Sequence, residues 1–241
     1  MAFNEKTFFQ YKESRALSGY RSAWLIKLPD NEDNKYSLIS ASETVPYPFG
    51  DKENFEFDLL QSPVIGQVEG KTSLESKDIE VLHHRDNAYR FEKLKGKIWD
   101  MMCINGEYMG YKFTGTVDYR PNDAEADVNR ATVTITPMDA ETVPVYNARP
   151  LILETLCFKD EIPATIKTSE TINLSVKQVE NSKVTVSAKA IANETNDETD
   201  ATNDVVSTDI SKVSITKEGL YALTVSAVGY ASWTTTVYVE A

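Results

Sequence analysis

The chain has 241 residues, a formal net charge of -12 at pH 7, 41% hydrophobic residues and 26% charged residues. This balance is ordinary for a soluble globular protein with one large domain or two small ones. The negative charge argues against a protein that grips nucleic acid through its phosphates, because that function needs clustered Lys and Arg. The N-terminus lacks the apolar core of a signal peptide, and no apolar run approaches a membrane span. We therefore expect cytoplasmic synthesis and no membrane insertion.

The first twenty residues mix polar and aromatic side chains, including Phe8 and Phe9. Two interpretations stay open for this segment: an arm packed on its own domain, or an aromatic contact with a neighbouring subunit. Residues 22–28 and residues 36–40 follow with strand patterns, and a turn-rich loop separates them.

The segment from residue 45 to residue 51 holds two prolines and one glycine, which predict an irregular loop. The loop either folds back on its own domain or reaches a neighbouring subunit or ring, and its aromatic residues favour the second interpretation. Residues 55–60 then alternate in the manner of a strand. The contact candidates in the loop are Pro46, Tyr47, Phe49 and Asp51.

Residues 77–138 change their hydrophobic period twice. Apolar residues at alternate positions predict a strand over Lys77–Leu82. Asp86 or Asn87 can cap a short helix, and Gly96 is a natural helix stop. Strand patterns then resume, with a hairpin turn signal inside them. The predicted segments are Ile98–Ile104, the turn Asn105-Gly106, Tyr111–Tyr119 and Ala131–Pro137.

Five short segments in this part of the chain carry a family resemblance. They read HRDN at 84–87, RFEKLKGK at 90–97, YKFTG at 111–115, YRPNDAE at 119–125 and TVTITP at 132–137. Together with the order strand, helix, strand, hairpin, acidic loop and strand, this wording resembles the major tail tube proteins of long-tailed bacterial viruses. The resemblance covers about the first two-thirds of the chain.

The resemblance implies a β-sandwich or barrel with one short flanking α-helix, over residues 1–160, that forms hexameric rings. Stacked rings would make a tube in the virion tail, assembled in the host cytoplasm, through which genomic DNA passes without specific binding. The implied partners are copies of the chain itself and other tail proteins, namely the tape measure, the tail terminator and the baseplate. The candidates for the inner sheet of such a tube are Tyr111, Phe113, Thr116, Tyr119, Thr132 and Thr134.

The composition changes in the last third of the chain. Every Phe lies at or before Phe158 and every Arg at or before Arg149, and the later residues are rich in Thr, Ser, Val and Asn. Short alternating strands with turn signals between them predict a small β-sandwich over residues 161–241. Gly219 and Tyr221 resemble the tyrosine corner of immunoglobulin-like domains, whose Tyr bonds back to upstream backbone. We expect a bacterial immunoglobulin-like domain that adheres weakly to host glycans or serves as dispensable decoration.

Candidate catalytic and metal sites are weak throughout the sequence. His83 and His84 are neighbours on a predicted strand end and point apart, which does not suit a shared metal. The acidic residues 118–127 lack an apolar cradle that would raise a carboxyl pKa for catalysis. Residues 193–204 are acidic but depart from a calcium loop; a mobile loop is the main prediction and weak calcium binding the alternative.

The sequence therefore predicts a non-enzymatic, cofactor-free structural protein. Cys103 and Cys157 are interpreted as small buried hydrophobic residues in a reduced compartment, with one disulfide as the alternative. The competing function is a surface adhesin or carbohydrate-binding module built from tandem β-sandwiches. The missing signal peptide pattern counts against that alternative.

Overall fold

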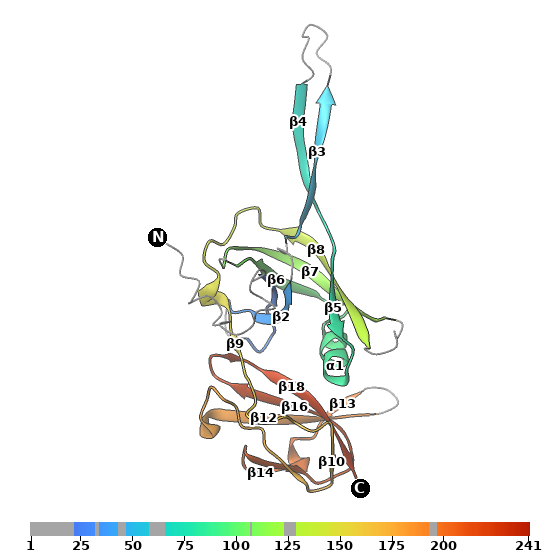
Figure 1. Ribbon diagram of the computed structural model, residues 1–241, viewed down its shortest axis with the longest axis vertical. Helices are drawn as coiled ribbons and strands as arrows, with labels where there is room; N and C mark the ends of the chain where they lie inside the picture. Colours follow the sequence, from blue (N-terminus) through green and yellow to red (C-terminus); the bar gives the residue numbers. More distant parts are fainter. Residues whose placement is uncertain are drawn as a thin grey trace. The chain divides into compact units, whose positions relative to one another are not determined.

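The computed structural model describes residues 22–31, 34–42, 47–57, 66–106, 108–122, 129–192 and 197–241 (Figure 1). The prediction of a mainly β fold with a single short α-helix is confirmed for these residues. The candidates Phe8, Phe9 and Pro46, and most of the acidic loop after Pro121, lie outside the described residues.

The chain forms two compact units, and the second unit collects three separate stretches of sequence. The first unit contains residues up to Lys27, Leu38–Val81 and Leu94–Pro150, and the second contains Leu28–Ser37, Leu82–Lys93 and Leu151–Ala241. The elements before Leu151 are β1 (Ser22–Ile26), β2 (Ser37–Ser42), β3 (Phe49–Phe57), β4 (Gly66–Leu74), β5 (Lys77–Leu82), α1 (Arg85–Leu94), β6 (Ile98–Ile104), β7 (Gly110–Pro121), β8 (Arg130–Ala140) and the 3-10 helix η3 (Arg149–Leu151).

The later elements are shorter and all but two are strands. They are β9 (Glu154–Thr155), β10 (Thr165–Lys167), β11 (Thr171–Ile172), η4 (Asn181–Lys183), β12 (Val184–Ile191), β13 (Glu198–Asp200), η5 (Thr202–Asp204), β14 (Val205–Asp209), β15 (Lys212–Ile215), β16 (Gly219–Ala227), β17 (Tyr230–Ala231) and β18 (Trp233–Glu240).

A six-stranded sheet forms the body of the first unit, in the order β2-β1-β6-β7-β8-β5. Alternation along β7 and β8 buries Val117, Val133 and Ile135 on one face of the sheet, as the sequence pattern predicted. All five residues of β1 are buried. Trp24 of that strand meets the ring of Phe113 edge to face, with 5.7 Å between ring centroids.

The hairpin between β6 and β7 is present, but its turn is longer than predicted. Ile104 pairs with Gly110, so residues 105–109 form the connection instead of the two residues Asn105 and Gly106. The Asn105 amide donates to the Met109 carbonyl at 2.8 Å, and the Asn105 side-chain oxygen accepts from the Met109 amide. An Asn side chain that bonds nearby backbone stabilises such a loop, which the Asn-Gly pattern alone did not reveal.

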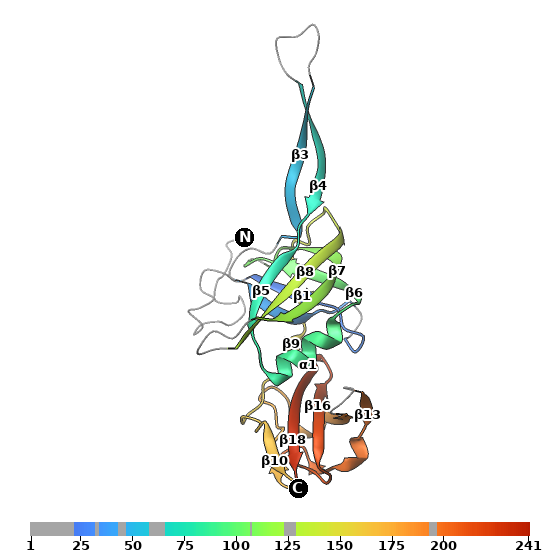
Figure 2. The ribbon, with the colours of Figure 1, turned by 90° about the vertical axis from the view of Figure 1, so that its right-hand side faces the viewer.

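β3 and β4 pair with each other and, among the described strands, with no third strand. Their register runs from Phe49↔Leu74 to Phe57↔Gly66, with two irregularities near Lys52. Figures 1 and 2 both show this hairpin extending beyond the end of the six-stranded sheet. The prediction of an irregular loop up to residue 51 is wrong at its end, because β3 already begins at Phe49. The pairing with β4 overrides a local sequence that has no alternation.

Helix α1 begins earlier than its predicted caps. The Ala88 amide donates to the His84 carbonyl, so Asp86 lies inside the first turn and is not the cap. The predicted stop is correct: Gly96 follows the helix with φ +72, a conformation that favours glycine. The Trp99 indole donates to the Leu94 carbonyl at 2.8 Å and satisfies one of the free carbonyls of the last turn.

The C-terminal sandwich consists of a five-stranded sheet, β10-β18-β16-β12-β13, and a three-stranded sheet, β11-β15-β14. A single core lies between them, and it includes the fully buried residues Leu174, Val213, Leu223 and Val237. β11 has only two residues, and β13 lies within residues 193–204, which were predicted to form a mobile acidic loop. β13 is ordered by its pairing with the end of β12.

Candidate assembly surfaces

Three aromatic rings form a cluster at the base of the β3–β4 hairpin. Tyr111 at the start of β7 meets Tyr47 and Phe49 edge to face, with ring centroids 5.8 Å and 5.1 Å apart. The structure thus brings two predicted contact residues together with one predicted inner-sheet residue. Tyr47 is 38% exposed, so the cluster is open to solvent on one side.

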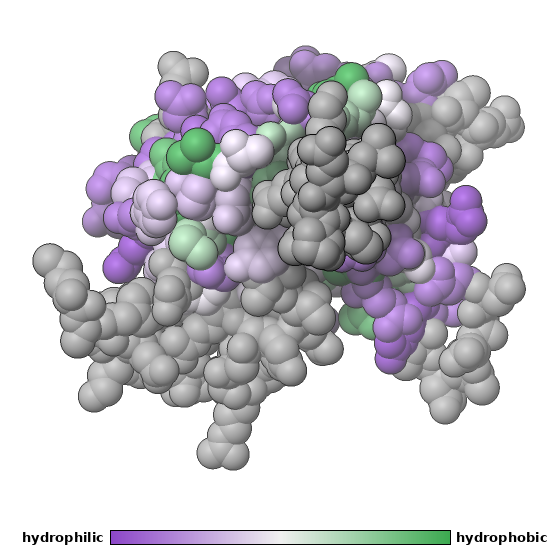
Figure 3. Space-filling model, turned by 90° about the horizontal axis from the view of Figure 1, so that it is seen from above, coloured by the Kyte–Doolittle hydropathy of each residue, from purple (hydrophilic) through white to green (hydrophobic). Residues whose placement is uncertain are grey.

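Further exposed apolar residues continue this cluster. Gly110 and Val145 exchange two backbone hydrogen bonds, at 2.9 and 2.7 Å, so the segment after β8 runs beside the start of β7. Its Val143 and Tyr146 are 68% and 76% exposed. Figure 3, which looks down on this end, shows hydrophobic residues in green among mostly hydrophilic ones. Sequence reasoning missed Tyr146 as a contact candidate.

The predicted inner-sheet residues divide between the two faces of β7 and β8. Phe113 and Tyr119 are buried, at 4% and 2% exposure, whereas Thr116, Thr132 and Thr134 are half-buried on the opposite face. Successive side chains of a strand point to opposite faces, so one contiguous list could not line a single surface. The open face of this sheet is therefore polar and rich in threonine, and we name it the threonine face.

Several charged side chains on the threonine face have a polar partner. Glu80 of β5 forms an ion pair with Arg130, and Asp78 accepts a hydrogen bond from Thr134 at 2.6 Å. Lys95 lies 3.3 Å from the Asp118 carboxylate, and its hydrogen bond lowers the pKa of that carboxyl. Such exposed pairs contribute little to folding stability, but they place a carboxylate beside each of these cations.

The strand order leaves β2 and β5 at the two edges of the six-stranded sheet. β5 pairs with β8 on one side, and no described strand pairs with its other side. An unpaired edge presents main-chain donors and acceptors that can bind another strand. β5 is therefore a candidate edge for association between subunits.

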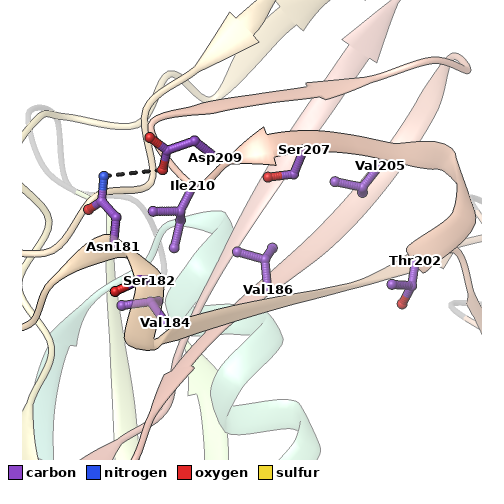
Figure 4. A pocket seen from close by; sticks show the side chains of 9 residues that line it. All are labelled: Asn181, Ser182, Val184, Val186, Thr202, Val205, Ser207, Asp209 and Ile210. Atoms are coloured by element: carbon purple, nitrogen blue, oxygen red, sulfur yellow. Dashed lines mark hydrogen bonds between the residues drawn. The ribbon is translucent and has the colours of Figure 1, made fainter.

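A hollow of about 690 Å³ lies in the C-terminal sandwich between β12 and β14 (Figure 4). Asp209 is the one titratable residue that lines this hollow. Its carboxylate accepts hydrogen bonds from the side-chain amide of Asn181 and from the backbone amide and the hydroxyl of Ser211. The bond from the Ser211 amide is the main reason that the pKa of Asp209 is lowered. A stably ionised carboxylate without a second titratable group lacks the pair that acid–base catalysis uses.

The tyrosine-corner candidates lie at the start of β16. Gly219 has φ +140, which favours glycine, and Tyr221 is 2% exposed. Burial and the nearby Asp204 carboxylate, to which the hydroxyl bonds, raise the pKa of Tyr221. Asp204 also binds Lys217 at 2.6 Å. The bond to upstream backbone that defines a tyrosine corner stays a prediction for Tyr221.

The remaining candidates show no chemical site. Within the described ranges, no group of three or more His, Cys, Asp or Glu residues could hold a metal ion. Cys103 is buried, which raises the pKa of its thiol to about 12, and Cys157 is exposed; both are free thiols. The prediction that both are buried is wrong for Cys157, which lies in the connection before the C-terminal sandwich.

Comparison with protein-family models finds no match, and comparison with curated proteins finds none either. Of the helices in the described part of the chain, none is long and apolar enough to span a membrane.

Proposed function

We propose that this protein is the subunit of a phage tail tube, a structural virion protein that polymerises as stacked hexameric rings around a DNA channel. The observation that carries the proposal is the β3–β4 hairpin, which extends from its unit with no third described strand beside it. An isolated two-stranded hairpin is at best marginally stable in water. A hairpin of nine residues in each strand therefore needs a partner surface, and another copy of the chain can supply one.

The amino-acid sequence of β3, β4 and the residues between them supports contact with another protein surface. Residues 55–68 contain Phe55, Phe57, Leu59, Leu60, Val64, Ile65 and Val68, and a sequence this apolar favours contact with another protein surface. The aromatic cluster at the base and the exposed Tyr146 extend the apolar surface at the same end of the unit. Contiguous exposed apolar surface is typical of protein–protein contact. We assign this end of the unit to contact between stacked rings.

The edges of the six-stranded sheet suit closure within a ring. If β5 of one subunit meets the β2 edge of the next, six copies form a closed barrel with no unpaired edge. The threonine face would then line the channel. DNA can pass only if it adheres weakly to the channel wall. At about 0.5 kcal/mol for each phosphate contact, one unpaired cation on each of six subunits would add about 3 kcal/mol of adhesion per ring. The carboxylates beside Arg130 and Lys95 reduce such adhesion.

The partners of this subunit would be other copies, the tape measure, tail terminator and baseplate proteins, and the passing genome. We propose no enzymatic activity and no cofactor. The alternative of a surface adhesin predicts monomers that bind glycans. The described hollow has no aromatic lining residue on which a sugar ring could stack, so no observation favours that alternative.

Self-association of the purified protein tests the proposal. Negative-stain electron microscopy and sedimentation across a concentration series should show rings or hollow tubes. A variant in which an Asn-Gly turn replaces residues 53–71 joins Lys52 to its partner Thr72, so the base of the hairpin is kept. We expect this variant to remain folded by circular dichroism and to lose stacking. A matched control is Val228→Ser, at a 93% exposed position of the C-terminal sandwich, which should assemble normally. A wild-type protein that stays monomeric at high concentration would refute the proposal.

A further inference from the structure

Helix α1 is bound by the C-terminal sandwich through the Asp86 carboxylate. One oxygen of Asp86 accepts hydrogen bonds from the Thr236 amide at 2.7 Å and the Thr236 hydroxyl at 2.6 Å, and the other accepts from the Thr235 hydroxyl at 3.2 Å. Thr235 and Thr236 are both buried, at 6% and 3% exposure. Three hydrogen bonds to one charged acceptor are stronger than neutral ones, and their loss leaves buried donors without a partner.

A second carboxylate, which belongs to the C-terminal sandwich, binds the same helix. Glu198 of β13 accepts a hydrogen bond from the Tyr89 hydroxyl at 2.6 Å and forms ion pairs with Lys93 at 2.5 Å and Lys189 at 3.0 Å. Its side chain is only 13% exposed. Burial alone would raise the pKa of Glu198, but the bonds from Lys93, Tyr89 and Lys189 outweigh it and lower the pKa to about 2. The helix is thus held at two points that lie on different strands.

Helix α1 also holds the end of the edge strand β5. The side-chain amide of Asn87 donates a hydrogen bond to the Leu82 carbonyl at 2.8 Å, and Leu82 is the last residue of β5. On the other side, the Arg85 guanidinium donates to the Ala164 carbonyl at 3.2 Å. A helix of ten residues is too short to be stable alone in water, so its order depends on these contacts.

From these contacts we infer that the C-terminal sandwich is a conformational support for α1 and, through Asn87, for the end of β5. The sandwich is an integral part of the subunit and not an appended outer module. The consequence for assembly rests on the proposed function: loss of the support loosens the edge that closes the ring, and ring formation then requires a higher protein concentration.

Hydrogen exchange measured by mass spectrometry on the full chain tests the support directly. Asp86→Ala should reduce amide protection over residues 85–94 and 77–82 by about tenfold or more, because it removes three charge-assisted bonds. Asp86→Asn retains an acceptor oxygen and should lose less. Glu218→Ala removes a carboxylate from an exposed position of the C-terminal sandwich and is the matched control, with unchanged protection of α1 and β5 expected. Thr236→Val removes one donor from the other partner and should reproduce a smaller loss if Asp86→Ala does not fold.

The same variants separate the two proposals. Unchanged protection of α1 in both Asp86→Ala and Thr236→Val would overturn the support. Loss of protection over α1 alone, with β5 unaffected, would overturn the link to the edge strand. If the wild-type protein forms tubes, the critical concentration for Asp86→Ala should rise at least about threefold over Glu218→Ala; equal values would overturn the consequence for assembly. If the wild-type protein forms no tubes, the tube proposal fails, and the exchange data still decide the support.

Discussion

The β7–β8 pair and the β3–β4 pair are both long antiparallel ladders, but they differ in what covers them. β7 and β8 sit inside a six-stranded sheet and bury one complete face, with Val133 and Ile135 at 0% exposure. Among the described strands, β3 and β4 pair only with each other, and Phe49 at the start of β3 contacts Tyr111 of β7. Burial of an apolar face stabilises the first pair within one chain. The second pair has no third described strand beside it, and its dependence on another molecule is part of the proposed function.

The largest expected effect comes from glycines at equivalent close approaches in the two pairs. A Cβ at Gly110, where β7 begins, would lie 1.9 Å from the Cys103 backbone oxygen, which cannot move without breaking the ladder. Gly110→Ala should cost about 4 kcal/mol or more of unfolding free energy. At Gly50 in β3 the nearest atom is the Ser73 hydroxyl at 2.6 Å, a side-chain atom that can rotate away.

Gly50→Ala should therefore cost about 1 kcal/mol or less. Chemical denaturation followed by circular dichroism measures both variants. Equal losses would mean that the hairpin is as constrained within one chain as the sheet is, contrary to the comparison.

Truncation of a core residue gives the next largest effect. Ile135→Ala removes a fully buried side chain from β8 and should destabilise the protein by about 3 kcal/mol, from lost burial and the resulting cavity. Ile98→Ala, in β6 of the same sheet at 63% exposure, is the matched control and should cost about 0.5 kcal/mol or less. The melting temperature of each variant is compared with that of wild type. Similar melting temperatures for the two variants would argue against a sheet that buries only one face.

The smallest expected effect is a pH dependence of the C-terminal sandwich. The folded-state pKa of Glu198 is lowered to about 2 from its ordinary value of 4.5, so its contribution to stability is present above pH 4.5 and is lost as the pH falls toward 2. Between pH 5 and 3, the melting temperature of wild type should fall more steeply than that of Glu198→Gln.

Asp118→Asn is the comparison in the six-stranded sheet. Its carboxyl pKa is also lowered, but its side chain is 52% exposed and solvent screens the pair with Lys95. This variant should follow the wild-type profile closely. If the melting temperature of wild type does not change with pH, or changes in parallel with that of Glu198→Gln, then the ion pairs of Glu198 do not stabilise the fold.

Local patterns in the sequence were sufficient for the elements whose partners are close in the chain. Alternation located β6 at its observed bounds and β7 and β8 to within three residues at each end. The αL glycine at position 96 located the end of α1. Each of these signals depends on periodicity or backbone conformation within a few residues, and so it can be read without knowledge of the fold.

Distant partners account for what local patterns did not reveal. β3 begins inside a predicted loop because β4 pairs with it, and β13 is ordered by β12. Asp86 carries the sequence signal of a helix cap, yet it binds Thr236, 150 residues away in the chain. A capping carboxylate and one that binds another strand have the same local sequence, so only the spatial neighbour distinguishes them.

The sequence by itself determined that this is a mainly β protein with one short helix, because alternation, turn residues and helix stops act over a few residues. Only the tertiary structure decided which face of each strand is open, that the β3–β4 hairpin has no described third strand, and that α1 belongs to the same unit as the C-terminal sandwich. These properties depend on contacts between residues far apart in the chain, and no short window of sequence specifies them.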